Sequence, residues 1–283
     1  MASFTNVATL SYNGNLISSN TVTGELQEAL SASKTAALTE YTPGSDITYI
    51  ISLVNSGSVS LNGLTLTDNL GAYEFEGNTL YPLAYADGSL KYFINGVLQA
   101  SPAVTAGPPL SVSGLSVPAG GNLMLVYEAA VTAFAPRSAE ASIANVATVS
   151  GEGLSEPLTV TETVFPADGA SLSITKALSP AVISENEPLT YTFTIQNTGN
   201  TEAGAEANII LTDTFNPVLS NISVTLNGVA LTDPADYTYN PNTGLFTTAA
   251  GRITVPAATF TQNADGSWVV TPGVSTLVVT GTV

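Results

Sequence analysis

The sequence repeats itself, and this repeat constrains the fold more than any other feature. In each copy a lysine precedes a tyrosine by fifteen residues and an Asn-x-Gly turn by twenty-one, and a Thr-Asp pair follows. These residues are Lys34, Tyr49, Asn55 and Asp68 in the first copy and Lys176, Tyr191, Asn197 and Asp213 in the second. Such self-similarity indicates two tandem copies of one structural unit.

Both copies have the pattern of β-structure. Short runs of alternating Thr, Val, Ile, Leu and Tyr end at Gly, Pro, Asn or Asp, as in residues 46–57. This alternation is typical of the strands of a β-sandwich. We therefore expect an all-β chain with two tandem β-sandwich domains, over residues 25–166 and 171–283. Residues 1–24 precede them as an N-terminal extension, and the linker is expected near residues 165–170.

The two copies differ at their ends. The first copy closes with an Asn-Val-Ala-Thr-Val-Ser run that begins at Asn145, whereas the second reaches Val283 without one. A matching run begins at Asn6. The second domain is therefore expected to lack its last strand, which exposes an apolar groove and unpaired strand edges. The expected occupant is the N-terminal donor strand of another copy, with these residues along one face: Phe4, Asn6, Ala8 and Leu10.

Three polar side chains per unit are expected to point into the core, because residues of equal parity share a face of a strand. They are Lys34, Asp68 and Asn145 in the first unit, and Lys176, Asp213 and the Asn6 of a neighbouring copy in the second. Burial lowers the pKa of a lysine and raises that of a carboxylic acid. The neutral amine can then attack the Asn carboxamide while the aspartate shuttles protons, which releases ammonia and leaves an isopeptide bond. The aspartates are thus the expected catalytic carboxylates.

Composition narrows the possible functions. The 283 residues include 22 acidic and 5 basic side chains, which gives a net charge of −17, and there is no His or Cys. These absences exclude Ser-His-Asp and Cys-His catalysis, imidazole or thiolate metal sites and disulfides. The acidity disfavours nucleic acid as a partner. We expect no metal, cofactor, small-molecule ligand or membrane span, no signal peptide is visible, and no enzyme activity is expected beyond autocatalytic crosslinking.

The combined pattern of Lys, Tyr, Asn-x-Gly, Thr-Asp and Asn-x-Ala-Thr-Val resembles the bacterial surface repeat catalogued as domain of unknown function number eleven. The resemblance covers both copies and the leading strand. It implies immunoglobulin-like sandwiches that are extracellular, on a bacterial cell or spore surface. Similar pilin and adhesin domains carry Lys-Asn isopeptide bonds, and this implies crosslinks at the positions named above.

Two functional hypotheses follow. The first is a subunit of a self-assembling surface or spore-appendage filament, a head-to-tail homopolymer formed by donor-strand exchange and locked by Lys176–Asn6 bonds. The alternative is a monomeric adhesin or stalk module that binds a host or matrix ligand. Simpler interpretations stay open: the lysines are exposed strand residues, the aspartates begin turns, and the N-terminal match marks a piece cut from a longer repeat array.

Overall fold

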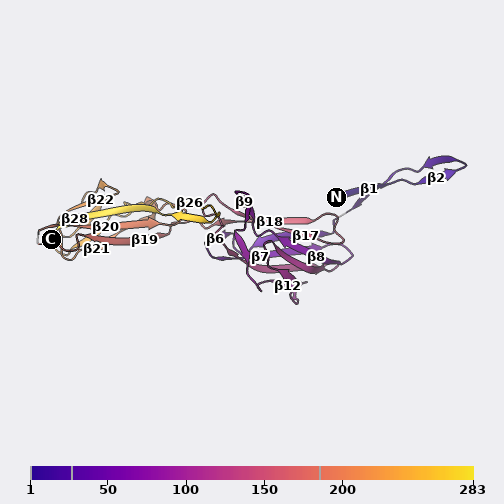
Figure 1. Ribbon diagram of the computed structural model, residues 1–283, viewed down its shortest axis with the longest axis horizontal. Helices are drawn as coiled ribbons and strands as arrows, with labels where there is room; N and C mark the ends of the chain where they lie inside the picture. Colours follow the sequence, from indigo (N-terminus) through magenta and orange to yellow (C-terminus); the bar gives the residue numbers. More distant parts are fainter. Residues whose placement is uncertain (1, 27, 185) are drawn as a thin grey trace. The chain divides into compact units, whose positions relative to one another are not determined.

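The computed structural model describes residues 2–26, 28–184 and 186–283, and apart from one short 3-10 helix the regular secondary structure of these residues is β-strand (Figure 1). The predicted all-β class is confirmed. The predicted extension and the two predicted domains each include one residue outside the described ranges, namely Met1, Gln27 and Glu185.

The chain forms two compact units. Unit 1 comprises Met1–Ala133 and Ile143–Val164, and unit 2 comprises Phe134–Ser142 and Phe165–Val283. Within the described ranges, no helix has the length and apolar character needed to cross a membrane. The same ranges contain no cluster of acidic side chains suited to a metal ion.

Unit 1 contains two six-stranded sheets. The first sheet has the order β13-β12-β16-β7-β5, with β11 also paired to β16. Its strands are β5 (Leu30–Ala36), β7 (Asp46–Asn55), β11 (Leu83–Tyr85), β12 (Lys91–Ile94), β13 (Val97–Leu98) and β16 (Asn122–Val131).

The second sheet of unit 1 has the order β14-β15-β8-β17-β18-β6. Its strands are β6 (Glu40–Tyr41), β8 (Leu61–Asp68), β14 (Ala103–Thr105), β15 (Leu110–Val117), β17 (Ile143–Ser150) and β18 (Leu158–Pro166). A small hairpin, β9 (Tyr73–Phe75) with β10 (Asn78–Leu80), lies outside both sheets.

The core of unit 1 follows from the period of two in its strands. Along β7 every second residue is buried, including Tyr49 and Ile51, and β16 repeats the pattern with Leu125 and Tyr127. Because alternate side chains of a strand point to opposite faces, each sheet offers one apolar face. The two faces together make the interior of a β-sandwich.

The N-terminal segment is a long hairpin, not the single strand that the sequence predicted. β1 (Ala2–Asn6) pairs with β4 (Val22–Leu26), and β2 (Thr9–Tyr12) pairs with β3 (Asn15–Ser18). The turn between them is Asn13-Gly14, where both residues have positive φ, as the two-residue turns favoured in hairpins require. We call residues 2–26 the N-terminal hairpin.

Unit 2 repeats the first sheet and only part of the second. The order β19-β20-β28-β22-β23 corresponds to β5-β7-β16-β12-β13. Its strands are β19 (Leu172–Ser179), β20 (Pro188–Asn197), β22 (Ser220–Leu226), β23 (Val229–Ala230) and β28 (Gly273–Thr282).

The second sheet of unit 2 has only three strands, in the order β21-β25-β24. They are β21 (Thr212–Thr214), β24 (Tyr237–Tyr239) and β25 (Leu245–Thr248). A short 3-10 helix (Ala205–Ala207) precedes β21, and β26 (Thr259–Gln262) pairs with β27 (Trp268–Thr271) apart from the sheets. β21 pairs with β25 along one edge, and no described strand pairs with its other edge.

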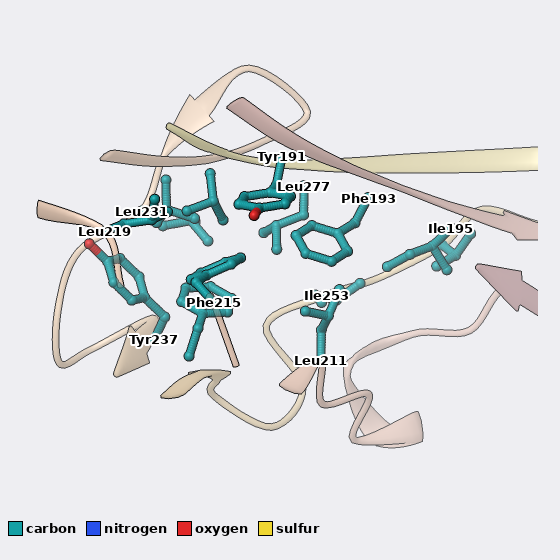
Figure 2. Packing of buried hydrophobic residues seen from close by; sticks show 14 of the residues in the cluster. Tyr191, Phe193, Ile195, Leu211, Phe215, Leu219, Leu231, Tyr237, Ile253 and Leu277 are labelled. Atoms are coloured by element: carbon teal, nitrogen blue, oxygen red, sulfur yellow. The ribbon is translucent and has the colours of Figure 1, made fainter. Parts of the chain in front are cut away.

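The core of unit 2 is aromatic. Figure 2 shows side chains from opposite sheets meeting there, among them Tyr191 and Phe215, whose ring centroids lie 4.9 Å apart. Stacked pairs of this kind add about 0.5–1.5 kcal/mol to the burial term. Unit 2 therefore has a packed interior although its second sheet has only three described strands.

Candidate crosslinking sites

A lysine and an aspartate meet inside unit 1. Lys34 comes from β5 and Asp68 from the end of β8, in the opposite sheet. Lys34 Nζ lies 2.6 Å from Asp68 Oδ2, and both side chains are 0% exposed. The other carboxylate oxygen accepts a hydrogen bond of 2.9 Å from the backbone N–H of Leu70. The pair therefore bridges the two sheets in a dry environment.

Tyr127 completes this arrangement from β16. Its hydroxyl donates a hydrogen bond to the same Asp68 oxygen that contacts Lys34. Burial raises the pKa of the Tyr127 hydroxyl, and the negative charge of Asp68 adds to the effect, so the phenol keeps its proton. Oδ2 of Asp68 is therefore held between two donors.

Burial also acts on the lysine. Loss of water around Lys34 lowers its pKa from 10.5 to about 8, although Asp68 opposes the change. The amine also lies 4.8 Å from the centre of the Tyr49 ring, whose face attracts the protonated amine. A pKa near 8 makes the neutral, nucleophilic amine accessible close to neutral pH.

Asn145 is the third member of the predicted set. It lies on β17 and is 0% exposed, and among the described residues neither its carboxamide nitrogen nor its oxygen has a hydrogen-bond partner. Ala147, two residues further along the same face, stands opposite Asp68 in the ladder of β17 with β8. A buried unpaired polar group costs about 1–3 kcal/mol, and in the described part of unit 1 the Tyr49 hydroxyl is buried without a partner as well.

These three side chains have the components of an amide-forming reaction. Attack of Lys34 Nζ on Cγ of Asn145 forms one C–N bond and breaks the bond to Nδ2. Asp68 can take a proton from the amine and return it to the leaving nitrogen, which departs as ammonia. Neither a metal nor an oxidant takes part in this balance.

Unit 2 holds the same pair in a more open setting. Lys176 on β19 forms an ion pair with Asp213 on β21, with side chains 41% and 20% exposed. The amine lies 4.4 Å from the ring centre of Tyr191 and 5.5 Å from that of Phe215. β17, which carries Asn145 in unit 1, has no counterpart among the described strands of unit 2. The unit 2 site therefore has the lysine and the aspartate, but no described strand that supplies an asparagine as β17 does in unit 1.

The predicted donor residues are all exposed. They lie in or next to β1 and β2 of the N-terminal hairpin, and the side chains of Phe4 and Leu10 are 59% and 63% exposed. Asn6 ends β1 and faces Val22 across the hairpin. Nothing in the described part of this hairpin buries its apolar side chains.

Tyr127 was missed by sequence reasoning. It sits among alternating apolar residues of β16, so its position predicts a core side chain and nothing more. The repeat also conceals it, because Val279 occupies the matching place opposite Tyr191, as Tyr127 does opposite Tyr49. The sequence signal that could have identified Tyr127 is the difference between the two copies, a tyrosine in the first and Val279 in the second.

Among solved structures, several pilins are similar to this chain. The major pilin BcpA of Bacillus cereus is 12% identical with a TM-score of 0.37, covering 95% of this chain and 73% of that one. The RrgB pilus backbone of Streptococcus pneumoniae is 11% identical with a TM-score of 0.34, covering 86% and 55%. A 35 kDa fragment of the major pilin GBS80 of Streptococcus agalactiae is 12% identical with a TM-score of 0.36, covering 87% and 91%.

No family model matches the sequence, and no curated protein matches it either. The resemblance to the bacterial surface repeat therefore stays a prediction.

Proposed function

We propose that this protein is the structural subunit of a bacterial surface filament, assembled head to tail by donor-strand exchange and locked by Lys–Asn isopeptide bonds. One observation carries the proposal. The same Lys–Asp pair occurs twice, with a buried asparagine strand in unit 1 and with an uncovered edge in unit 2. The asparagine run that suits the open edge is present in the exposed N-terminal hairpin.

The energetics favour docking of that segment. Burying Phe4 and Leu10 contributes about 1.5–3 kcal/mol each, and each ladder hydrogen bond adds about 0.5–1.5 kcal/mol. Docking would also cover Lys176 and remove it from water, as Lys34 is in unit 1. The amine of Lys176 would then meet the Asn6 carboxamide of a second copy under conditions that favour the neutral nucleophile.

Filaments and their bonds can be tested separately. Electron microscopy of the purified protein should show filaments, and boiling in SDS should leave a ladder of multimers that has lost one ammonia per bond. Lys176→Ala and Asn6→Ala should remove the ladder, whereas Lys91→Ala, which alters the remaining lysine, should keep it. Monomeric particles would contradict the filament, and a wild-type protein that boils to monomer would contradict the bonds.

The strand pairing has its own test. In unit 1 Thr148 faces Thr67, and the matching residues of the proposed junction are Thr9 and Thr212. Because the chain has no Cys, the double variant Thr9→Cys/Thr212→Cys should form a disulfide between subunits on oxidation, at a separation that such bonds allow. Thr9→Cys alone should not, and failure of the double variant would contradict donor-strand exchange in this register.

A further inference from the structure

The gap in the second sheet of unit 2 corresponds to two missing strands. In unit 1 both β17 and β18 lie between β8 and β6. In unit 2 the counterpart of β8 is β21, and the constant spacing of the repeat places the counterpart of β6 at residues 182–183. No described strand of unit 2 lies between them. One added strand would fill only half of this space.

Exposure on both sides of the gap agrees with its width. Leu172 of β19 is 44% exposed, whereas its counterpart Leu30 in the complete unit 1 is 6% exposed. Val182, at the far side, is 88% exposed, and Ile210, just before β21, is 55% exposed. Val182 corresponds to Glu40, which is exposed in the complete unit 1 as well, so the informative residue at the far side is Ile183. Its counterpart Tyr41 is buried, whereas Ile183 is only partly buried, as expected where a neighbouring strand is missing.

The N-terminal hairpin has the layout of the missing pair of strands. In the closing hairpin of unit 1, Asn145 faces Glu162 and Ile143 faces Val164. In the N-terminal hairpin, Asn6 faces Val22 and Phe4 faces Gly24. The ring of Phe4 covers Gly24, where a Cβ would clash with Phe4 Cζ. The Phe4–Gly24 pair of the N-terminal hairpin therefore occupies the same place as the buried Ile143–Val164 pair of the closing hairpin.

Charge and exposure identify the hairpin as an element that binds a partner. Residues 2–24 include no charged side chain, in a chain of net charge −17. Cross-strand partners share a face, so the apolar side of the hairpin includes Leu10 with its partner Ile17, which are 63% and 57% exposed. An isolated two-stranded hairpin is marginally stable in water. A hairpin that carries no charged side chain over residues 2–24 and exposes one apolar side is stabilised by docking.

We infer that a second copy of this chain donates its whole N-terminal hairpin to unit 2, an inference that rests on the proposed function. The first strand pairs with the free edge of β21, with Ala8 opposite Asp213, as Ala147 is opposite Asp68. The second strand pairs with residues 182–183, as β18 pairs with β6. The donated element thus restores the full strand order of unit 1.

Two neighbouring side chains distinguish a hairpin from a single donated strand. Ile17 lies on the face shared with Leu10, whereas Leu16 pairs with Ser11 on the opposite face and is 75% exposed. In the full chain, Ile17→Asp should lower the filament yield at fixed concentration by about tenfold or more. Leu16→Asp, the matched control, should assemble like the wild type.

Hydrogen exchange provides a second measurement that does not depend on the folding of a variant. Amides of residues 15–24 and 182–184 should exchange more slowly in wild-type filaments than in freshly purified subunits. Equal assembly of the two variants together with unchanged exchange at residues 182–184 would overturn the hairpin and leave single-strand exchange standing. Failure of the Thr9–Thr212 disulfide would instead overturn donor-strand exchange itself.

Discussion

At the scale of single residues, the two Lys–Asp pairs differ in the side chain at one neighbouring position of the first sheet of each unit. Tyr127 donates to Asp68 in unit 1, whereas Val279 occupies the equivalent place in unit 2. The hydroxyl holds the Asp68 oxygen at the lysine amine. We therefore expect the internal bond of unit 1 to form without a partner, and the unit 2 bond to depend on docking for its alignment.

Replacing Tyr127 by Phe should slow crosslinking in unit 1. The ring, 5.6 Å from that of Tyr49, is kept, and one hydrogen bond to a charged group is lost. Such a bond contributes about 1.5–3 kcal/mol, so the rate should fall about tenfold or more. The rate is measured as loss of ammonia by mass spectrometry after refolding of unreacted chain.

Tyr85→Phe is the matched control for this rate. The Tyr85 ring also packs against Tyr127, at 6.3 Å, but its hydroxyl accepts a bond from the Leu90 backbone and does not contact Asp68. Its rate should equal that of the wild type. A Tyr127→Phe rate that also equals the wild type would reduce Tyr127 to a packing residue.

The pH dependence of the same reaction tests the role of Asp68. The neutral amine with a protonated acid carries the same number of protons as the ion pair, so the rate should not change with pH while the pair keeps its proton. The pair loses that proton near the pKa of Lys34, about 8. The rate should therefore be level from pH 7 to about 8 and fall above it. A rate that rises through pH 8 would show that the free amine alone is sufficient.

At the scale of strands, the sequence predicted much of the fold because alternation is a direct consequence of strand geometry. The alternation of side chains along each strand is sufficient to predict that Lys34 and Asn145 point inward. The Thr-Val-Thr of residues 21–23 repeats residues 159–161 of β18, but the pairing of this segment with the first strand as a hairpin was not predicted. The exposure of Lys176 could not be predicted either, since it depends on which strands cover β19.

The Asn-x-Gly motif that revealed the repeat has a structural role at the ends of β7 and β20. The Asn55 side chain donates to the carbonyls of Val59 and Val117, at 2.9 and 3.2 Å, and accepts from the N–H of Gly57. Asn197 makes the matching bonds to Thr201 and Pro256. Each asparagine therefore ties a central strand to two neighbouring segments.

Asn55→Ala should destabilise unit 1 by about 1–3 kcal/mol, because the buried carbonyl of Val117 loses its partner, together with the part-buried bonds to the Val59 carbonyl and the Gly57 N–H. Urea unfolding followed by circular dichroism in an Asn145→Ala background, where no internal crosslink can form, measures this loss. Asn62→Ala, at an exposed position of β8, should stay within about 0.5 kcal/mol of the parent. Equal stabilities would contradict the structural role of the motif.

At the scale of the whole molecule, charge opposes assembly. Two copies of net charge −17 repel each other, whereas residues 2–24 of the N-terminal hairpin carry no charged side chain and add nothing to this repulsion. The screening length falls from about 30 Å at 0.01 M salt to about 8 Å at 0.15 M. Encounter between subunits should therefore depend strongly on ionic strength.

Raising NaCl from about 0.01 to about 0.15 M should speed filament growth by about tenfold or more, as followed by light scattering. Sucrose at matched osmolality should have little effect, since it does not screen charge. Growth at the same rate at both NaCl concentrations would mean that docking, not the encounter of subunits, limits assembly.

The position of the Lys34 site in the chain also bears on mechanical load. Lys34 lies on the first strand of the unit 1 sandwich and Asn145 on the first strand of its closing hairpin. A stretching force along the chain enters this sandwich at β5 and leaves it at β18. A covalent link between Lys34 and Asn145 would carry tension across the fold directly, so the strands between them would bear none of the pull.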